Sequence, residues 1–490
     1  MNILFAAAEM APFCKTGELA DVIGDLPPAV AERGHSVAVV IPGYAVIDRA
    51  RHGFIEQGIW IQVPVGCDLK MLSVSSLEWR GVTVYLIEND EYFVRPGIYG
   101  DPGGEYGDNG VRFMFFSRAV IEILKIVGFR PDVIHAHDWP TALVVAYIKS
   151  LYAKDPFFSG TATLFTIHRL QYQGIFHESV FWLSGLPGDL FHRASMEHYG
   201  NVSFLKGGVA LADAVSTVSE RYARDIATRE NGFGLHELFA SRANDLYGIT
   251  NGIDLSASDP STNPLIPARF DVDDLAGKKE CRLALLHACG LTPDDNVPVF
   301  GMVSRLSDNK GVHQIDAASS VLDEFDIQGI FLGTDTPEHQ SLMIKFASSY
   351  PRRIRVMLRF DKKMAHMIYA GADAYLMPSK FEPCGLAQFI AMRYGALPVV
   401  HATGGLADSI IDLDSDPENG NGFSFREYTT AAFKDAVSRT VRAFLEPGRE
   451  RWNAAVRRAM SGDYSWNRSA ERYIDLYHRI HEKSAASLNQ

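Results

Sequence analysis

Short apolar runs alternate along the chain with longer stretches that have helical spacing. Residues 2–8 and 37–41 predict buried strands, and between them apolar residues recur at helical intervals from Ala20 to Val30. Pro27 and Pro28 lie inside this stretch. Because proline cannot donate the backbone hydrogen bond of a helix, we expect the helix to break or restart there. The order strand, loop, helix, strand is typical of a mononucleotide-binding unit, which forms one half of a doubly wound α/β domain.

The same alternation continues and then starts again in the second half of the chain. The pattern predicts strands at residues 60–65, 82–88, 163–167, 298–304, 330–333, 354–359, 374–377 and 397–400, with helices at 112–127, 386–394, 430–445, 450–460 and 470–481. Between the halves, a turn-rich tract with Pro260, Pro264 and Pro267 follows residues 249–254. Domain boundaries concentrate in such tracts, so we expect two domains that meet near residue 249.

Length and charge narrow the class of protein. The chain has 490 residues, which suits two domains better than one core, and its 47% hydrophobic and 22% charged residues are typical of a globular protein. The formal net charge of -12 argues against nucleic acid or an anionic membrane as a partner, since both attract basic surfaces. An anionic nucleotide can still bind in a locally basic cleft.

The cysteines and the apolar runs indicate the compartment. The 5 cysteines are scattered, so they indicate neither paired zinc ligands nor a full disulfide framework. The chain opens without a basic leader, and no run is long and apolar enough to span a bilayer. We therefore expect a cytoplasmic protein. We expect no metal and no cofactor.

The stretch 378–409 carries the densest candidate chemistry. It predicts two helix starts close together, after Cys384-Gly385-Leu386 and at Thr403-Gly404-Gly405. Helix starts offer unpaired N–H groups and partial positive charge, which suit a diphosphate, and glycine allows close approach of the backbone to a ligand. Glu382 precedes the first start, where a carboxylate can hold sugar hydroxyls. Each piece by itself is more typical of an ordinary turn.

Charged and polar side chains follow other predicted strands. Arg305 and Lys310 follow residues 298–304, and two cations five residues apart can face a diphosphate together. Lys15 lies in the loop after the first strand, where ligands bind in open α/β sheets, although this loop by itself favours a solvated surface lysine. Asp138 and His168 each follow a strand. His135 is explained by a core histidine with satisfied hydrogen bonds.

In this order the segments resemble the glycogen and starch synthases, retaining glucosyltransferases of the bacterial type (glycosyltransferase family 5). The resemblance covers nearly the whole chain and is carried by Lys15-Thr16-Gly17, His137-Asp138-Trp139, His168, Ser304-Arg305-Leu306 and 378–409. It implies the GT-B fold, an α/β fold of two Rossmann-like domains facing across a cleft. Residues 1–248 then form an acceptor-side domain joined by a C-terminal helix at about 465–490, and residues 249–464 form the domain that binds the nucleotide sugar.

The resemblance also implies a reaction and a set of residues. Glucose moves from ADP-glucose to the non-reducing end of an α-1,4-glucan (glycogen or maltodextrin) with retention of configuration and without a metal. The implied catalytic residues are Asp138, His168, Arg305, Lys310 and Glu382. The implied nucleotide-sugar-binding residues are Lys15, Gly17, Asp21, Asn251, Cys384, Gly385, Leu386, Thr403, Gly404 and Gly405.

Three positions depart from the family pattern. Glu18 replaces a second glycine after Gly17, and Pro140 and Arg169 replace the usual histidine and asparagine. Glu18 either repels a diphosphate or points away at a helix start, where negative charge is favourable. A degenerate relative that binds glucan or nucleotide without turnover therefore stays an alternative. The same fold using UDP-glucose also stays open, because in this family the contacts to adenine or uracil are made largely by the backbone.

Overall fold

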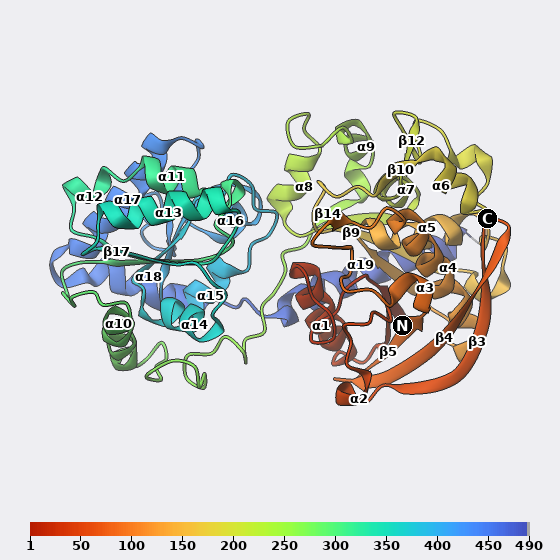
Figure 1. Ribbon diagram of the computed structural model, residues 1–490, viewed down its shortest axis with the longest axis horizontal. Coiled ribbons are helices and arrows are strands. Elements are labelled where there is room, and N and C mark those ends of the chain that lie inside the picture. The colour runs from red at the N-terminus through yellow and green to blue at the C-terminus, as the bar shows by residue number, and fades with distance from the viewer. Residues whose placement is uncertain (488–490) are drawn as a thin grey trace. The chain divides into compact units, whose positions relative to one another are not determined.

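A computed structural model of the protein describes residues 1–487 (Figure 1). The chain folds into two compact units. Unit 1 comprises residues 1–251 together with the C-terminal segment from Trp466 onward, and unit 2 comprises residues 252–465.

Unit 1 is built on a nine-stranded sheet. Its strands, in spatial order, are β14 (Leu246–Gly248), β13 (Ala214–Thr217), β9 (Ala162–Ile167), β8 (Val133–His137), β1 (Asn2–Ala6), β2 (Ser36–Pro42), β5 (Val82–Glu88), β4 (Asp68–Trp79) and β3 (Ile55–Val65). Pairing is parallel from β14 to β5, and β5, β4 and β3 form an antiparallel meander. The strand order reverses between β1 and β8, which is the switch point where open α/β sheets bind ligands.

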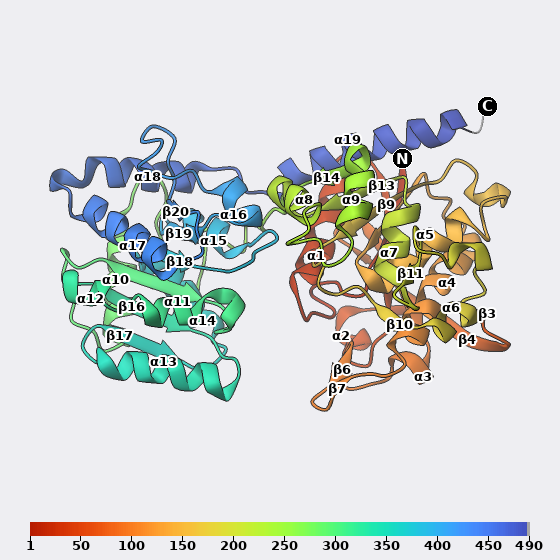
Figure 2. The same cartoon turned by 90° about the horizontal axis from the view of Figure 1, so that it is seen from above.

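Long helices cover both faces of this sheet (Figure 2). Helices α1 (Glu18–Ala31) and α19 (Trp466–Ser487) lie on one face, and α4 (Asn109–Val127), α5 (Ala142–Lys149) and α7 (Phe204–Leu211) lie on the other. On α19, the residues Trp466, Ala470, Tyr473, Tyr477 and Ile480 are buried at intervals of three and four. This apolar stripe holds the C-terminal helix against unit 1.

The remaining elements of unit 1 are short. They are α2 (Arg49–His52), α3 (Asp90–Phe93), α6 (Glu178–Leu183), α8 (Glu220–Ile226), α9 (His236–Ser241), β6 (Gly100–Asp101), β7 (Gly104–Glu105), β10 (Ile175–His177), β11 (Glu197–His198) and β12 (Asn201–Ser203).

Helix α1 is continuous through both prolines, so the predicted break is wrong. Pro28 has no N–H to donate to the carbonyl oxygen of Gly24, four residues earlier. Arg80 supplies the missing donor, with its Nη1 3.2 Å from that oxygen. The same nitrogen lies 2.7 Å from Asp25 Oδ1. A long-range side chain therefore replaces the hydrogen bond that the local sequence cannot make.

Strand β4 was not predicted, because serines interrupt its apolar pattern. Ser73 and Ser75 are buried at the centre of the strand. Ser75 Oγ donates to Glu88 Oε1 on the neighbouring strand β5 at 3.1 Å. A buried polar group that is hydrogen-bonded in this way is tolerated in a sheet, although it hides the strand from a hydrophobicity pattern.

Unit 2 has a six-stranded sheet that is parallel throughout. Its spatial order is β17 (Ile354–Met357), β16 (Gln328–Leu332), β15 (Val299–Val303), β18 (Ala374–Met377), β19 (Leu397–His401) and β20 (Phe423–Phe425). Numbered within the unit this is 3-2-1-4-5-6, the strand order of doubly wound dinucleotide-binding folds. The switch point lies between β15 and β18.

Helices sandwich this sheet as well (Figure 1). One face carries α11 (Val312–Ala317), α12 (Val321–Glu324), α13 (Pro337–Ser349) and α17 (Thr430–Leu445), and the other carries α10 (Ala276–Ala288), α14 (Lys362–Gly371), α15 (Ala387–Arg393) and α18 (Glu450–Ser461). Helix α16 (Gly404–Ser409) follows β19.

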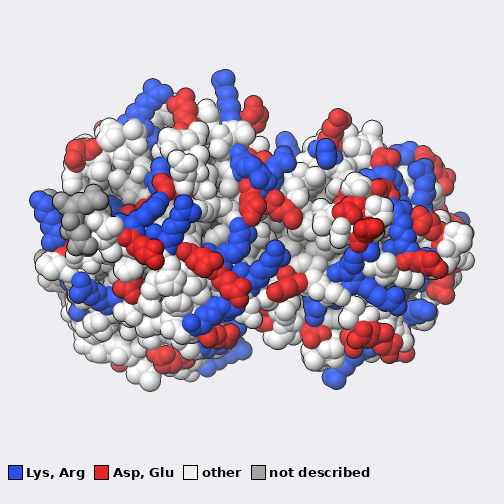
Figure 3. Space-filling model, turned by 180° about the vertical axis from the view of Figure 1, so that it is seen from behind, with Lys and Arg blue, Asp and Glu red and all other residues white. Residues whose placement is uncertain are grey.

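The distribution of charged side chains on the surface and the polarity of the helices agree with the composition of the chain. Acidic and basic side chains are interspersed over the face of the molecule in Figure 3, without a continuous basic surface on that face. Among residues 1–487, no helix combines the length and the apolar composition that a membrane span requires.

Candidate active site

The residues singled out in unit 1 follow the strands at its switch point. Lys15 and Gly17 lie in the loop after β1, Asp138 directly follows β8, and His168 directly follows β9. Parallel strands bring their carboxyl ends to one edge of a sheet, so these segments share that edge. Their shared role at one site stays a prediction.

Glu9 organises the loop that carries Lys15 and Gly17. Its carboxylate accepts hydrogen bonds from the Thr16 N–H (2.5 Å), the Thr16 hydroxyl (2.6 Å), the Gly17 N–H (3.0 Å) and the Tyr99 hydroxyl (2.8 Å). Glu9 is only 3% exposed. The sequence analysis did not single out Glu9, although an acidic residue just after a buried strand was the available signal. The Gly17 N–H is thus bonded within the protein.

The remaining residues of this loop form the start of α1. Lys15 Nζ lies 2.6 and 2.7 Å from the two carboxylate oxygens of Asp21, in a pair that is substantially exposed. Gly17 is the N-cap of α1, and a β-carbon built on it would have no neighbour within 4 Å. Glu18 is the first residue of α1. Its carboxylate is in the first helical turn, where the helix dipole favours negative charge.

Asp138 adopts an unusual backbone conformation at the end of β8. Its φ is 57° and its ψ is 178°, a region that non-glycine residues rarely occupy and that costs energy. Its carboxylate accepts a hydrogen bond from the His168 N–H at 2.8 Å. Burial of the carboxyl group raises the pKa of Asp138 to about 7, against the lowering effect of hydrogen bonds from the His168 and Arg169 backbones. The carboxyl group therefore changes its protonation state near neutral pH.

His168 is paired with a histidine that the sequence analysis did not single out. His168 Nε2 and His137 Nδ1 are 3.0 Å apart, and both side chains are buried. Burial, together with the positive charge of Arg169, lowers the pKa of His168 to about 3. The ring is therefore neutral at pH 7. Its other nitrogen, Nδ1, is buried and has no hydrogen-bond partner among the described residues.

His135 has the structural role that the sequence indicated. Its Nδ1 lies 2.8 Å from the Tyr477 hydroxyl of α19, and its Nε2 lies 2.5 Å from Thr166 Oγ1. Both ring nitrogens are thus hydrogen-bonded inside the core. Asn251, the last residue of the first segment of unit 1, is 3% exposed, and its Oδ1 has no partner among residues 1–487.

In unit 2, the candidate cations and the candidate carboxylate follow neighbouring strands at the switch point. Lys310 Nζ lies 2.5 Å from Glu382 Oε2, and Ser379 Oγ donates to the same oxygen at 3.0 Å. The Glu382 side chain is 2% exposed and that of Lys310 is 17% exposed. The structure thus brings together two residues that are 72 positions apart. Arg305 is exposed, and its guanidinium has no partner within the described part of the chain.

The two helix starts of the 378–409 stretch lie against each other. A β-carbon on Gly404 would be 2.2 Å from the Glu382 carbonyl oxygen, and one on Gly405 would be 2.2 Å from the Cys384 carbonyl oxygen. Glycine is therefore required here for close packing of protein backbone. The Gly405 N–H donates to the carbonyl oxygens of Glu382 (3.2 Å) and Pro383 (2.9 Å), so it is engaged within the protein.

The rest of this stretch forms the same two helix starts. Thr403 is the N-cap of α16 and Leu386 is the N-cap of α15. Gly385 has a φ of 74°, which favours glycine at this turn. Cys384 is fully buried.

Comparison with known proteins decides the family. The profile of the starch synthase catalytic domain matches residues 2–241, and that of the glycosyl transferases group 1 matches residues 290–458. The glycogen synthase of Geotalea daltonii is 42% identical over 480 residues, which cover 98% of this chain and 99% of that protein. The chain belongs to the glycogen and starch synthase family. Glycogen synthase 2 of Geobacter sulfurreducens is 41% identical, with 97% of this chain and 98% of that protein covered.

Solved structures of related proteins agree with this family. The catalytic domain of starch synthase IV from Arabidopsis thaliana, solved with ADP and acarbose, matches with a TM-score of 0.88 and 33% identity, covering 98% of this chain and 99% of that one. Sucrose-phosphate synthase from Thermosynechococcus elongatus shares the fold, with a TM-score of 0.60 and 16% identity over 98% of this chain and 99% of that one. The predicted family, the GT-B fold class and the enzyme class, a glucosyltransferase, are confirmed.

Proposed function

We propose that the protein is a glycogen synthase that transfers glucose from ADP-glucose to the non-reducing end of an α-1,4-glucan, with retention of configuration. The observation that carries this proposal is the full-length likeness to glycogen synthases and to a starch synthase that was solved with ADP and acarbose. Acarbose is a glucan-like oligosaccharide, so that neighbour supports both an adenine nucleotide donor and a glucan acceptor. The cytoplasmic location expected from the sequence stays a prediction.

In this proposal, unit 1 is the acceptor-side domain and holds the transferred glucose. His168 is neutral at pH 7 and has a buried Nδ1 without a partner among the described residues, so this atom can bond a sugar hydroxyl. Asp138 changes protonation near neutral pH, so its carboxyl group can accept from or donate to a hydroxyl. The hydrogen bond from the His168 N–H to Asp138 keeps the two groups in a fixed relation.

Unit 2 is the nucleotide-sugar domain in this proposal, and its cations stabilise the leaving diphosphate. Negative charge builds on the diphosphate as the bond to glucose breaks, and fixed positive charge lowers the energy of that state. Arg305 is exposed and free of partners among the described residues, so it is available to bind phosphate. Lys310 is held by Glu382, which positions its ammonium group and leaves other N–H donors for the ligand. In this proposal Glu382 holds Lys310 through this contact and also accepts hydrogen bonds from sugar hydroxyls.

The remaining residues carry the donor nucleotide in the way that the family pattern implies. Lys15 and Asp21 form the ion pair at the start of α1, and Gly17 leaves open space beside its α-carbon. The other residues assigned to donor binding are Asn251, Cys384, Gly385, Leu386, Thr403, Gly404 and Gly405. Gly405 contributes through packing, because its N–H already donates hydrogen bonds to protein carbonyl oxygens.

Incorporation of glucose into glycogen tests the proposal, with ADP-glucose and UDP-glucose supplied side by side. Three proteins are compared: the unmodified chain, Glu18→Gly, and the matched control Glu178→Gly, which also replaces a glutamate at the first position of a helix. Turnover by the unmodified chain with ADP-glucose supports the proposal. Turnover that appears only in Glu18→Gly identifies a synthase site disabled at its donor loop. Absence of turnover in all three proteins supports the non-catalytic alternative.

A further inference from the structure

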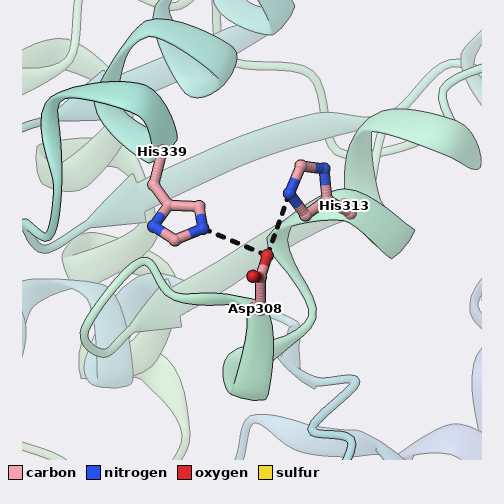
Figure 4. Close-up of side chains that lie close together, drawn as sticks. All are labelled: Asp308, His313 and His339. Atoms are coloured by element: carbon pink, nitrogen blue, oxygen red, sulfur yellow. Dashed lines mark hydrogen bonds and ion pairs between the residues drawn. The ribbon is translucent and has the colours of Figure 1, made fainter.

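A second cluster of chemically active side chains lies in unit 2, on the turn and the helices that follow β15 and β16. It comprises Asp308 of the 3₁₀ turn Asp308–Lys310, His313 of α11 and His339 of α13 (Figure 4). These residues have no part in the glucosyl transfer proposed above. No short metal-ligand spacing marks this cluster in the sequence, because His339 comes from another helix and lies 26 positions after His313.

The three side chains converge on one point. His313 Nε2 lies 2.9 Å from Asp308 Oδ1, and His339 Nε2 lies 3.0 Å from the same oxygen. Their potential ligand atoms all lie within 4.8 Å of one another. Around a four-coordinate zinc ion with bonds of 2.0–2.2 Å, neighbouring ligand atoms are about 3.4 Å apart. A movement of less than about 1 Å by these side chains would therefore admit an ion.

The ring of His339 is oriented by contacts to its second nitrogen, Nδ1, as is usual for histidines in metal sites. Its Nδ1 lies 2.9 Å from the Thr336 hydroxyl and 3.7 Å from an oxygen of Asp335. Metal-ligating histidines usually direct their second ring nitrogen at an oxygen, which fixes the ring and the tautomer. The His339 side chain is 13% exposed, whereas Asp308 and His313 are open to solvent. An ion could thus enter from one side.

We propose that Asp308, His313 and His339 form a binding site for a divalent transition-metal ion of the imidazole-binding class, represented by Zn²⁺. Two imidazoles and one carboxylate suit such ions, whereas Mg²⁺ and Ca²⁺ take oxygen ligands. The ion would join the turn Asp308–Lys310 to α11 and α13, with its remaining positions open to water.

The site has a structural connection to the candidate active site. Asn309, next to Asp308, accepts a hydrogen bond from the Lys380 N–H at 2.9 Å and donates to the Phe381 carbonyl at 3.0 Å. Lys310, the following residue, pairs with Glu382. An ion on Asp308 would therefore restrain the turn that carries Lys310. This consequence rests on the proposed function, whereas ion binding itself does not.

Calorimetric titration of the full chain with ZnCl₂, after treatment with a chelator and without nucleotide, tests the proposal. Every protein carries Cys67→Ser, so that this exposed thiol does not bind the ion. We expect one Zn²⁺ per chain and at least about a tenfold loss of affinity in His313→Ala and in His339→Ala. The control His287→Ala removes an exposed histidine of α10 in the same unit and should bind Zn²⁺ like the parent.

X-ray absorption of the zinc-loaded protein gives a second readout that does not depend on activity. The expected first shell contains only nitrogen and oxygen, with an imidazole signature that His313→Ala reduces. His313 is 59% exposed, so its replacement tests the site even if His339→Ala does not fold. The proposal is overturned if the parent binds no Zn²⁺ at micromolar concentration, if His313→Ala binds as tightly as the parent, or if Mg²⁺ binds equally well.

Discussion

Replacing Asp138 by asparagine measures the free-energy cost of burying an ionisable carboxyl group in unit 1. The pKa of this group is about 7 in the folded protein and 3.8 in an exposed chain. Well below pH 3.8 the group is protonated in both states and does not affect stability. As the pH rises from 4 through 7, the unfolded chain ionises first, so the folded state loses stability.

The size of the effect follows from the difference between the two pKa values. One pKa unit corresponds to about 1.4 kcal/mol, so ionised Asp138 costs the folded state about 4 kcal/mol above pH 7, of which about 2.5 kcal/mol develops between pH 5 and pH 8. Asparagine has nearly the same shape, tolerates a positive φ and keeps an oxygen for the His168 N–H. Asp138→Asn should therefore gain about 2.5 kcal/mol relative to the unmodified protein over this pH interval.

Urea unfolding at pH 5, 6, 7 and 8, followed by tryptophan fluorescence, measures this gain. Five of the 6 tryptophans lie in unit 1, so the signal reports chiefly on that unit: Trp60, Trp79, Trp139, Trp182 and Trp466. A free-energy difference between variant and parent that changes by less than about 1 kcal/mol from pH 5 to pH 8 would refute the reasoning.

His168→Gln serves as a control of opposite sign. The pKa of His168 is about 3 in the folded protein and 6.5 in an exposed chain. The stability that the neutral ring contributes is complete above pH 6.5 and is lost as the pH falls toward 3. The glutamine variant should therefore lose less stability than the parent on acidification, and a steeper loss would contradict the assignment.

Two further predictions concern the glycines and the ion pair. Gly405→Ala places a β-carbon 2.2 Å from the Cys384 carbonyl oxygen and should destabilise unit 2 by about 2–3 kcal/mol in urea unfolding. A β-carbon on Gly17 has no neighbour within 4 Å, so Gly17→Ala should change the free energy of unfolding by less than about 0.5 kcal/mol. Gly17→Ala should instead raise the KM for ADP-glucose. Equal effects on stability would contradict both. Lys310→Ala leaves the buried Glu382 carboxylate without its cation and should cost about 3 kcal/mol, most of which Lys310→Ala/Glu382→Gln should recover. A double variant no more stable than the single one would show that the pair is not coupled.

The alternation of strands and helices was readable from the sequence because buried parallel strands are continuous apolar runs. The strand at residues 82–88 was predicted with its observed bounds, and residues 397–400 and 112–127 were predicted within a few residues. The failures have long-range causes. Helix α1 continues through Pro28, where Arg80, more than fifty positions away, supplies the missing donor. Strand β4 was hidden by buried serines that bond to Glu88.

The candidate site was predicted as individual residues, whereas their partners were not. The roles of His137 and Glu9 were not predicted. His137 was named only as part of the His137-Asp138-Trp139 motif, and the importance of both residues depends on contacts with His168 and with the Thr16–Gly17 amides. The Lys310–Glu382 pair joins residues on two loops, so no local pattern contains it. The glycines of the Thr403 turn were recognised, but their steric reason, the backbone at Cys384, comes from another segment.

The proposed glucosyl transfer from ADP-glucose requires Arg305 at the leaving diphosphate. The most direct test is the kcat/KM for glucose incorporation into glycogen from ADP-glucose and from UDP-glucose, measured for the unmodified protein, Arg305→Ala and the control Arg352→Ala. Arg305 and Arg352 are both exposed arginines of unit 2, so neither replacement should disturb the fold. We expect a preference for ADP-glucose, a loss of about 10²-fold or more in Arg305→Ala, and an unchanged rate in Arg352→Ala. Incorporation from neither donor, or an Arg305→Ala protein as active as the parent, would refute the proposed role of Arg305 or the proposed reaction.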